Sequence, residues 1–266
     1  MSRRGPVCTL TLDEPARLNP LSEAVRRRLD TMVRRLGSDT GTRVVVLRGA
    51  GRAFSGGVDL SARDAARLQA MSWSERRRAS GAWQRTLAGL EALPQPTVAS
   101  LHGWVVGGAA LLACCCDLRI AADDLRLSIP ELRLGIPLTW AGLPRLVREI
   151  GLPRTRDLVM TGRPVSAIEA IEWGLVQRVV PVAQLAAATD ALAADLLRLP
   201  AVPLALTKEA LSAIGRAASA EVVAWADADL LSWSMGEPEG QAAATQYLAS
   251  LRAARERRGG PPAAGE

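Results

Sequence analysis

Lysine, histidine and most aromatic residues are nearly absent from this chain. Its 266 residues include one lysine, one histidine, one tyrosine and one phenylalanine, although seven tryptophans are present. The formal charge of +6 therefore comes from arginines, which are scattered along the sequence. Proteins that bind single-stranded nucleic acid interleave basic and aromatic residues, and that pattern is missing here. We expect no nucleic-acid partner, and a small polyanionic ligand suits the positive charge at least as well.

Long apolar runs and paired cysteines are also lacking. No stretch of about eighteen apolar residues is free of charge, so we expect no membrane span, and the most apolar run, at 104–116, suits a buried helix. The N-terminal segment lacks the apolar core of a secretory signal, which favours a cytoplasmic location. Cys114, Cys115 and Cys116 are consecutive. Adjacent cysteines match neither a disulfide framework nor the spacing of zinc ligands, so we expect no metal.

The order of strand-like and helix-like segments predicts an α/β protein. Runs at 7–12, 43–48, 96–101 and 118–122 suit strands, and the segment that Ser22 opens has the apolar spacing of a helix. Beyond Thr139 helical patterns dominate. We expect an α/β core with the active site at 1–199, a helical region at 200–258, and a disordered tail at 259–266, where glycine, proline and alanine prevail.

Two glycine-rich turns follow predicted strands. The first is FSGGVDL at 54–60, and the second is HGWVVGGA at 102–109. Glycine lets the backbone approach a ligand closely, and one N–H group from each turn would make a two-donor oxyanion hole. Each glycine pair taken alone also suits an ordinary tight turn. Neither turn has the glycine spacing of a phosphate-binding or dinucleotide-binding loop, so we expect no nucleotide.

The order of several motifs resembles the enoyl-CoA hydratase/isomerase family, also called the crotonase family. The resemblance covers residues 7–180 and fades in the C-terminal helices. The motifs that carry it are FSGGVDL (54–60), PTVASLHGW (96–104), the glycine pair at 107–108, CDLRI (116–120), PELRLG (130–135), PRL (144–146), TGR (161–163) and WGLV (173–176).

This resemblance implies a fold, a ligand and an assembly. The fold is a spiral of ββα units with a helical C-terminal region that forms a homotrimer or a dimer of trimers. The ligand is an acyl-CoA thioester whose carbonyl accepts hydrogen bonds from two backbone N–H groups, which fall on Gly56 and Gly108. Coenzyme A is then part of the substrate, and no separate cofactor is implied.

Only one of the two glutamates that hydratases of this family use is retained. Those enzymes hold a water between two glutamates, whose positions here are Leu111 and Glu131. Leu111 cannot deprotonate water, whereas Glu131 can move a proton between two carbons. A glutamate in an apolar acyl pocket should have a raised pKa, which suits this role. Trp140 stands where many hydratases have small residues, so its indole should narrow the pocket or displace water, and Thr139 offers a hydroxyl.

Five further residues are candidate ligand contacts. Phe54 and Asp59 flank the first turn and are candidates for touching the substrate, although Asp59 also suits a helix cap. Arg17, Arg52 and Arg63 near the expected pocket mouth are candidates for the CoA phosphates. For each of these arginines, solvated surface charge is the alternative.

Three functions are open on these residues. We favour an enoyl-CoA isomerase-like reaction with Glu131 as the proton shuttle. The second is a 2-enoyl-CoA hydratase that recruits its water with Glu131 and Thr139. The third is a non-catalytic acyl-CoA-binding protein, which Leu111 and Trp140 support and the retained Glu131 opposes.

Overall fold

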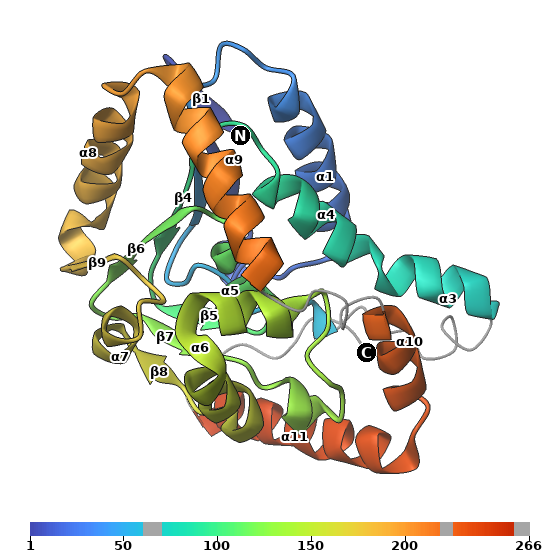
Figure 1. The fold of residues 1–266 in the computed structure, drawn as a ribbon. Coiled ribbons are helices and arrows are strands. Elements are labelled where there is room, and N and C mark those ends of the chain that lie inside the picture. The colour runs from blue at the N-terminus through green and yellow to red at the C-terminus, as the bar shows by residue number, and fades with distance from the viewer. Residues whose placement is uncertain (61–70, 219–225, 258–266) are drawn as a thin grey trace.

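The computed structural model describes residues 1–60, 71–218 and 226–257 (Figure 1). Its strands form a large sheet and a small one, and helices cover both faces of the large sheet. The predicted α/β class is therefore confirmed. Arg63 and the tail at 259–266 lie outside the described residues. Within the described ranges, no helix is both long enough and apolar enough to cross a membrane.

The large sheet has its six strands in the order β1-β2-β3-β4-β6-β9. β1 pairs antiparallel with β2, and every other neighbouring pair is parallel. Most of β3, and all of β4, is buried, which explains their aliphatic sequences. The strand bounds are β1 (Ser2–Arg4), β2 (Val7–Leu12), β3 (Val44–Gly49), β4 (Thr97–Leu101), β6 (Leu118–Ala122) and β9 (Arg178–Val180).

The two faces of this sheet bury alternate residues of each strand. Val44 and Val46 of β3 pack in a cluster with helix α8 (Leu185–Leu197), whereas Val45 and Leu47 belong to a larger core on the opposite face. The helices whose side chains complete the larger core include α1 (Glu23–Gly37), α4 (Ala82–Glu91) and α5 (Gly108–Cys114). Ser22 caps α1 by accepting a hydrogen bond from Val25 N–H, as predicted.

A small sheet interrupts the segment predicted as one helix at 104–116. It contains β5 (Trp104–Val106), β7 (Arg126–Ser128) and β8 (Val165–Ser166). β5 pairs parallel with β7, so helix α5 begins only at Gly108. The prediction missed β5 because the strand is three residues long and its partner lies 22 residues further along the chain.

Helices dominate after residue 139, as predicted. The bounds are α6 (Gly142–Thr161), α7 (Ala167–Glu172), α9 (Ala201–Ala218), α10 (Asp227–Ser234) and α11 (Pro238–Arg257), with α3 (Trp73–Ser80) and the 3-10 turns η1 (Pro15–Arg17), η3 (Glu131–Leu134) and η4 (Val182–Gln184) completing the described elements. α11 packs against η3, where a Cβ on Gly135 would lie 2.3 Å from Gly240 Cα. The C-terminal helix therefore lies beside the segment that carries Glu131.

Candidate active site

The first glycine turn is fixed by the buried side chain of Asn19. Asn19 Nδ2 donates to the carbonyl oxygens of Ala50 (2.8 Å) and Ala53 (2.9 Å), and Asn19 O accepts a hydrogen bond from Ser55 Oγ (2.8 Å). Asn19 is 1% exposed and has a left-handed backbone, with φ of 52°. A buried amide with these partners holds the chain that follows β3 in one conformation. Asn19 was not predicted to have this role, because the sequence shows only a single asparagine before a proline.

The amides of the first turn differ in whether they are already bonded. Gly56 N–H donates to Leu18 O at 2.7 Å, and Gly57 N–H donates to Ser55 Oγ at 3.1 Å. In the described part of the chain the Val58 N–H has no partner. The prediction that Gly56 is an oxyanion donor is therefore wrong, because the fold already uses its N–H. The amide that is left available belongs to Val58.

The second glycine turn leaves the amide of Gly108 available. Gly107 N–H donates to Ser128 O at 2.8 Å, and its φ of 55° favours glycine. Gly108 is the first residue of α5, and its N–H is not bonded to any described residue. The two turns lie side by side, since Ser55 and Val105 form a parallel bridge. One unpaired N–H from each turn is thus available in neighbouring segments.

Glu131 lies against the beginning of α5. A Cβ on Gly107 would fall 2.5 Å from Glu131 Oε1, so glycine is needed for this approach. Glu131 Oε2 is buried and has no hydrogen-bond partner among residues 1–60, 71–218 and 226–257. This burial raises the pKa of Glu131 from 4.5 to about 7. A carboxyl group with that pKa populates both protonation states near neutral pH, which suits proton transfer.

Two candidate substrate contacts prove to be core residues. Leu111 is 1% exposed, and a Cβ on Gly142 would fall 2.8 Å from one of its δ-carbons. Phe54 is completely buried. Both side chains are packed in the core of the described structure, and their contacts with substrate stay predictions. Position 111, where the family's hydratases have their first glutamate, is filled with packed hydrocarbon.

Trp140 covers Gly108, as the expected narrowing of the pocket requires. A Cβ on Gly108 would fall 2.3 Å from Trp140 Cζ3, so the edge of the indole lies directly on this glycine. Trp83 of α4 stacks on Trp140, with ring centroids 4.9 Å apart and planes 18° apart. Thr139 is buried beside it, and Thr139 O accepts a hydrogen bond from Gly142 N–H at 3.0 Å. The two indoles thus make an apolar wall over the start of α5.

The predicted phosphate contacts have different surroundings. Arg17 forms an ion pair with Asp59 at 2.9 Å, which occupies both side chains. The carboxylate of Asp59 is therefore paired with Arg17. The helix that Asp59 was expected to cap would begin outside the described residues. Arg52 is exposed, and its carbonyl oxygen would lie 2.3 Å from a Cβ on Gly103. Of the two predicted arginines that the structure describes, Arg17 and Arg52, only Arg52 faces solvent without an ion pair to a described residue.

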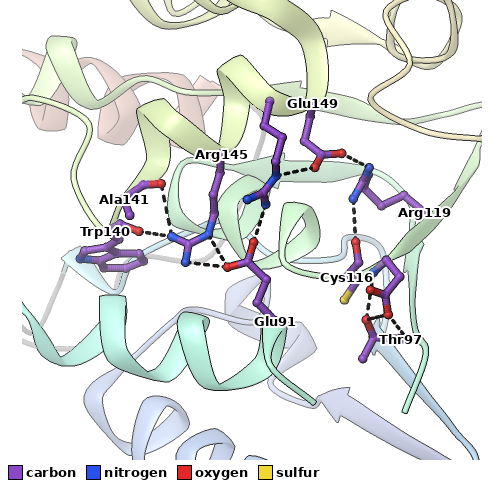
Figure 2. A network of polar contacts seen from close by, with 10 residues as sticks. Glu91, Thr97, Cys116, Arg119, Trp140, Ala141, Arg145 and Glu149 are labelled. Carbon is purple, nitrogen blue, oxygen red and sulfur yellow. Dashed lines mark hydrogen bonds and ion pairs between the residues drawn. The ribbon is translucent and has the colours of Figure 1, made fainter. Parts of the chain in front are cut away.

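A network of ion pairs and hydrogen bonds that the sequence did not predict holds the segment of Trp140 in place (Figure 2). Arg145 donates to the carbonyl oxygens of Trp140 and Ala141, and its other side pairs with Glu91 at 2.9 Å. Glu91 also pairs with Arg148. Burial alone would raise the pKa of Glu91, but the two arginines outweigh it and lower that pKa below 4.5. The PRL motif at 144–146 was the only signal of this network in the sequence.

The same network reaches the other end of α5. Arg148 pairs with Glu149, and Glu149 pairs with Arg119, which is 3% exposed. Arg119 Nη1 donates to Cys116 O at 2.7 Å. Burial raises the pKa of the Cys116 thiol to about 12, so this cysteine is an inert packing residue, as expected. No group of three or more metal-ligating side chains occurs in the part of the chain that is described.

Comparisons with known proteins agree on one family. The family model described as enoyl-CoA hydratase/isomerase matches residues 2–253. A relative from Thermus thermophilus that carries an enoyl-CoA hydratase name is 36% identical over 211 residues, which are 79% of this chain and 82% of the relative.

Solved structures agree with this match. The crystal structure of an enoyl-CoA hydratase from Mycobacterium avium subsp. paratuberculosis has a TM-score of 0.82 at 25% identity, covering 92% of this chain and 96% of that one. A monofunctional enoyl CoA isomerase from M. smegmatis has a TM-score of 0.68 at 32% identity, covering 82% of this chain and 93% of that one. The similarity therefore includes both hydratases and an isomerase.

Proposed function

This chain belongs to the enoyl-CoA hydratase/isomerase family, and we propose that within it the chain acts as an enoyl-CoA isomerase with Glu131 as the only proton carrier. One observation supports this proposal above the others. Glu131 has a buried oxygen without a partner among the described residues and a pKa raised to about 7, whereas the position of a second glutamate is the enclosed Leu111. A single carboxyl group can take a proton from one carbon and return it to another, but it has no second carboxylate with which to hold a water.

The reaction follows from the groups at the start of α5. The ionised Glu131 removes a proton from the α-carbon of a 3-enoyl-CoA thioester, and the electron pair moves onto the thioester oxygen. The N–H groups of Val58 and Gly108 donate to the enolate oxygen that forms. Protonated Glu131 then returns the proton to the γ-carbon, the double bond moves to the 2,3-position, and the conjugated 2-enoyl-CoA leaves.

The apolar wall of Trp83 and Trp140 supports isomerisation over hydration. The two stacked indoles against Gly108 provide no carboxylate that could hold a water. An apolar wall also keeps water away from the enolate, so that the proton returns to carbon. Burial raises the pKa of the Glu131 carboxyl group to about 7, which suits proton transfer between carbons.

The proposal is tested by incubating the protein with a 3-enoyl-CoA and following conjugation by ultraviolet absorbance. We expect turnover by the natural protein and a loss of about 10²–10⁴-fold in kcat/KM in Glu131→Gln, which is the usual contribution of a positioned general base. Glu172→Gln serves as the control, because Glu172 is exposed. Turnover that is equal in Glu131→Gln and the natural protein would contradict the proposal.

Hydration of a 2-enoyl-CoA is the second candidate, and the hydratase names among the relatives favour it. In that case Glu131 and Thr139 would hold the water together. Appreciable turnover of crotonyl-CoA that is lost in Thr139→Val would select this function. Tight binding of acyl-CoA in calorimetry, with no turnover of either enoyl substrate, would select a non-catalytic binding protein.

We also propose that Arg52 contacts the phosphates of CoA and that the chain assembles with copies of itself into a trimer or a dimer of trimers. Arg52 is exposed two residues before the first turn begins, where a charged group of the ligand can reach it. Helix α9 supports the assembly, because several of its aliphatic side chains are exposed, namely Val202, Leu206, Leu211 and Ile214. Light scattering of the purified protein would give the number of copies.

A further inference from the structure

Trp140 and Ala141 have a backbone conformation that their side chains disfavour. Their φ angles are 63° and 56°, in the left-handed region that glycine prefers. Left-handed residues other than glycine persist only where their surroundings hold them in place. The structure therefore has to contain groups that fix this pair of residues, and these groups decide where the indole of Trp140 lies.

Two charged side chains hold the two peptide groups. Arg145 donates to the carbonyl oxygens of Trp140 and Ala141, as Figure 2 shows. Asp227 Oδ2 accepts a hydrogen bond from Ala141 N–H at 2.6 Å. Asp227 is 8% exposed, and burial raises its pKa above 3.8. A buried carboxylate on a backbone amide makes a strong hydrogen bond, because one partner is charged.

These two contacts come from different parts of the chain. Arg145 belongs to α6, which follows Ala141 directly, whereas Asp227 is the first residue of α10 in the C-terminal region. α10 also contacts α3, where Arg77 pairs with Asp229 at 3.1 Å. The C-terminal helical region is thereby bonded to the backbone of the residue after Trp140.

The indole that results from this backbone lies between two surfaces. Trp83 stacks on it, and Gly108 accommodates its edge only because glycine has no Cβ. A small rotation of the peptide between Trp140 and Ala141 would move the ring away from Gly108. The position of the indole against Gly108 therefore depends on the hydrogen bond to Asp227.

We propose that Asp227 is a positioning residue that holds the indole of Trp140 against Gly108, so that helix α10 of the C-terminal region sets the width of the acyl pocket. The consequence for substrate rests on the proposed function, whereas the position of the indole does not. Arg145 contributes to the same geometry, but its ion pair with Glu91 also supports the core. Asp227 is thus the residue whose substitution separates positioning from general stability.

The experiment compares Asp227→Ala, Asp227→Asn and the control Asp229→Ala. Asp227→Asn keeps an oxygen that can accept from Ala141 N–H, and Asp229→Ala removes a more exposed ion pair of the same helix. Near-ultraviolet circular dichroism reports the stacked pair of Trp83 and Trp140. Calorimetry with saturated butanoyl-CoA reports binding without turnover, and KM and kcat are measured with short-chain 3-enoyl-CoA.

We expect Asp227→Ala to reduce the dichroic signal of the indole pair. The same variant should bind butanoyl-CoA about tenfold more weakly, equal to about 1.4 kcal/mol, and its KM should rise by about the same factor. kcat should change by less than about threefold, because Glu131 and the two N–H groups stay in place. Asp227→Asn should recover binding to within about threefold of the natural protein. Asp229→Ala should leave the dichroic signal and the binding constant unchanged.

Unchanged dichroism and binding in Asp227→Ala would overturn the proposal, as would an Asp227→Asn variant that behaves like Asp227→Ala. If the alanine variant does not fold, Asp227→Glu replaces it, since the longer side chain displaces Ala141 while keeping the charge. The expected changes then have the same direction, and their absence would overturn the proposal. Dichroic and binding changes in a protein without isomerase turnover would support the positioning role and contradict the proposed function instead.

Discussion

The two sides of the start of helix α5 differ in how completely their polar groups are satisfied. On one side Glu131 lies against Gly107 with a buried oxygen that has no partner in the described structure. On the other side Trp140 lies against Gly108, held by a stacked indole and by charged side chains that bond its segment. The side with Trp140, where the polar groups are paired, fixes the shape of the site. The side with the unsatisfied carboxyl group keeps a group whose protonation can change.

This difference shows where the protein is stabilised and where stability is given up. A buried carboxyl group without a partner destabilises the fold and is retained only where its chemistry is used. The paired charges around Arg145 satisfy one another and hold a left-handed segment in place. Substitutions on the two sides should therefore have opposite effects on stability.

The largest effect on stability is expected on the side with Trp140, in Glu91→Ala. This change leaves Arg145 and Arg148 without the carboxylate that lies between them, and breaking a buried pair costs about 3–5 kcal/mol. The free energy of unfolding in urea measures the loss. Glu23→Ala at an exposed position of α1 is the matched control, since its surface pairs contribute about 0.5 kcal/mol or less. Equal losses in the two variants would contradict the bracing role.

The next effect concerns the two amides of the first glycine turn. Replacing the amide of Val58 by an ester removes its N–H and should lower kcat by about 10²–10³-fold, as the loss of one oxyanion donor does. The same replacement at Gly56 removes the hydrogen bond to Leu18 O and should cost about 1 kcal/mol of stability, with little effect on kcat. The reverse order of effects on kcat would restore Gly56 as the donor.

The contribution of Glu131 to the free energy of unfolding should fall as pH rises. In the unfolded chain the carboxyl group ionises near pH 4.5, whereas in the fold its pKa is about 7. Between these values the folded state holds a proton that the unfolded state has lost, so stability decreases through this window by up to about 3 kcal/mol.

Glu131→Gln lacks this proton equilibrium. It should therefore be more stable than the natural protein at about pH 8, and the difference should nearly vanish at about pH 4.5. Urea unfolding at both pH values measures this. The isomerase activity of the natural protein should rise with an apparent pKa of about 7, because the ionised carboxylate is the base. A variant that is less stable than the natural protein at the higher pH would contradict the assignment.

The smallest effect compares Ala substitutions at two glycines. In Gly108→Ala the new Cβ meets Trp140 Cζ3 at 2.3 Å, and overpacking of this kind costs about 1–3 kcal/mol. In Gly56→Ala the nearest atom is Leu18 Cβ at 3.4 Å, an ordinary contact, so stability should change by about 0.5 kcal/mol or less. Thermal unfolding of the two variants measures the difference. A Gly108→Ala variant as stable as Gly56→Ala would show that the indole moves freely.

The sequence predicted those parts of the molecule that depend on local patterns. The central strands and the helix capped by Ser22 are found in the structure. Strand β5 was missed because its pairing partner is distant in the chain, and a three-residue strand has no periodicity of its own.

The active site was predicted in outline and not in its hydrogen bonds. Glu131 and Trp140 were selected because each stands in a recognisable motif, and they lie against Gly107 and Gly108. Gly56 was predicted as the donor because a sequence does not show that Leu18 O already accepts the hydrogen bond of its amide. The contact of Asp227 with Ala141 joins segments 86 residues apart, and no local pattern indicates it.

Product analysis in water labelled with heavy oxygen tests the central claim most directly. The natural protein is incubated with a 3-enoyl-CoA in labelled water, and the products are weighed by mass spectrometry. We predict that the conjugated 2-enoyl-CoA accumulates with the mass of the substrate and without label, since a single carboxyl group moves only a proton. A labelled 3-hydroxyacyl-CoA as the main product, formed while Glu131 is intact, would contradict the claim.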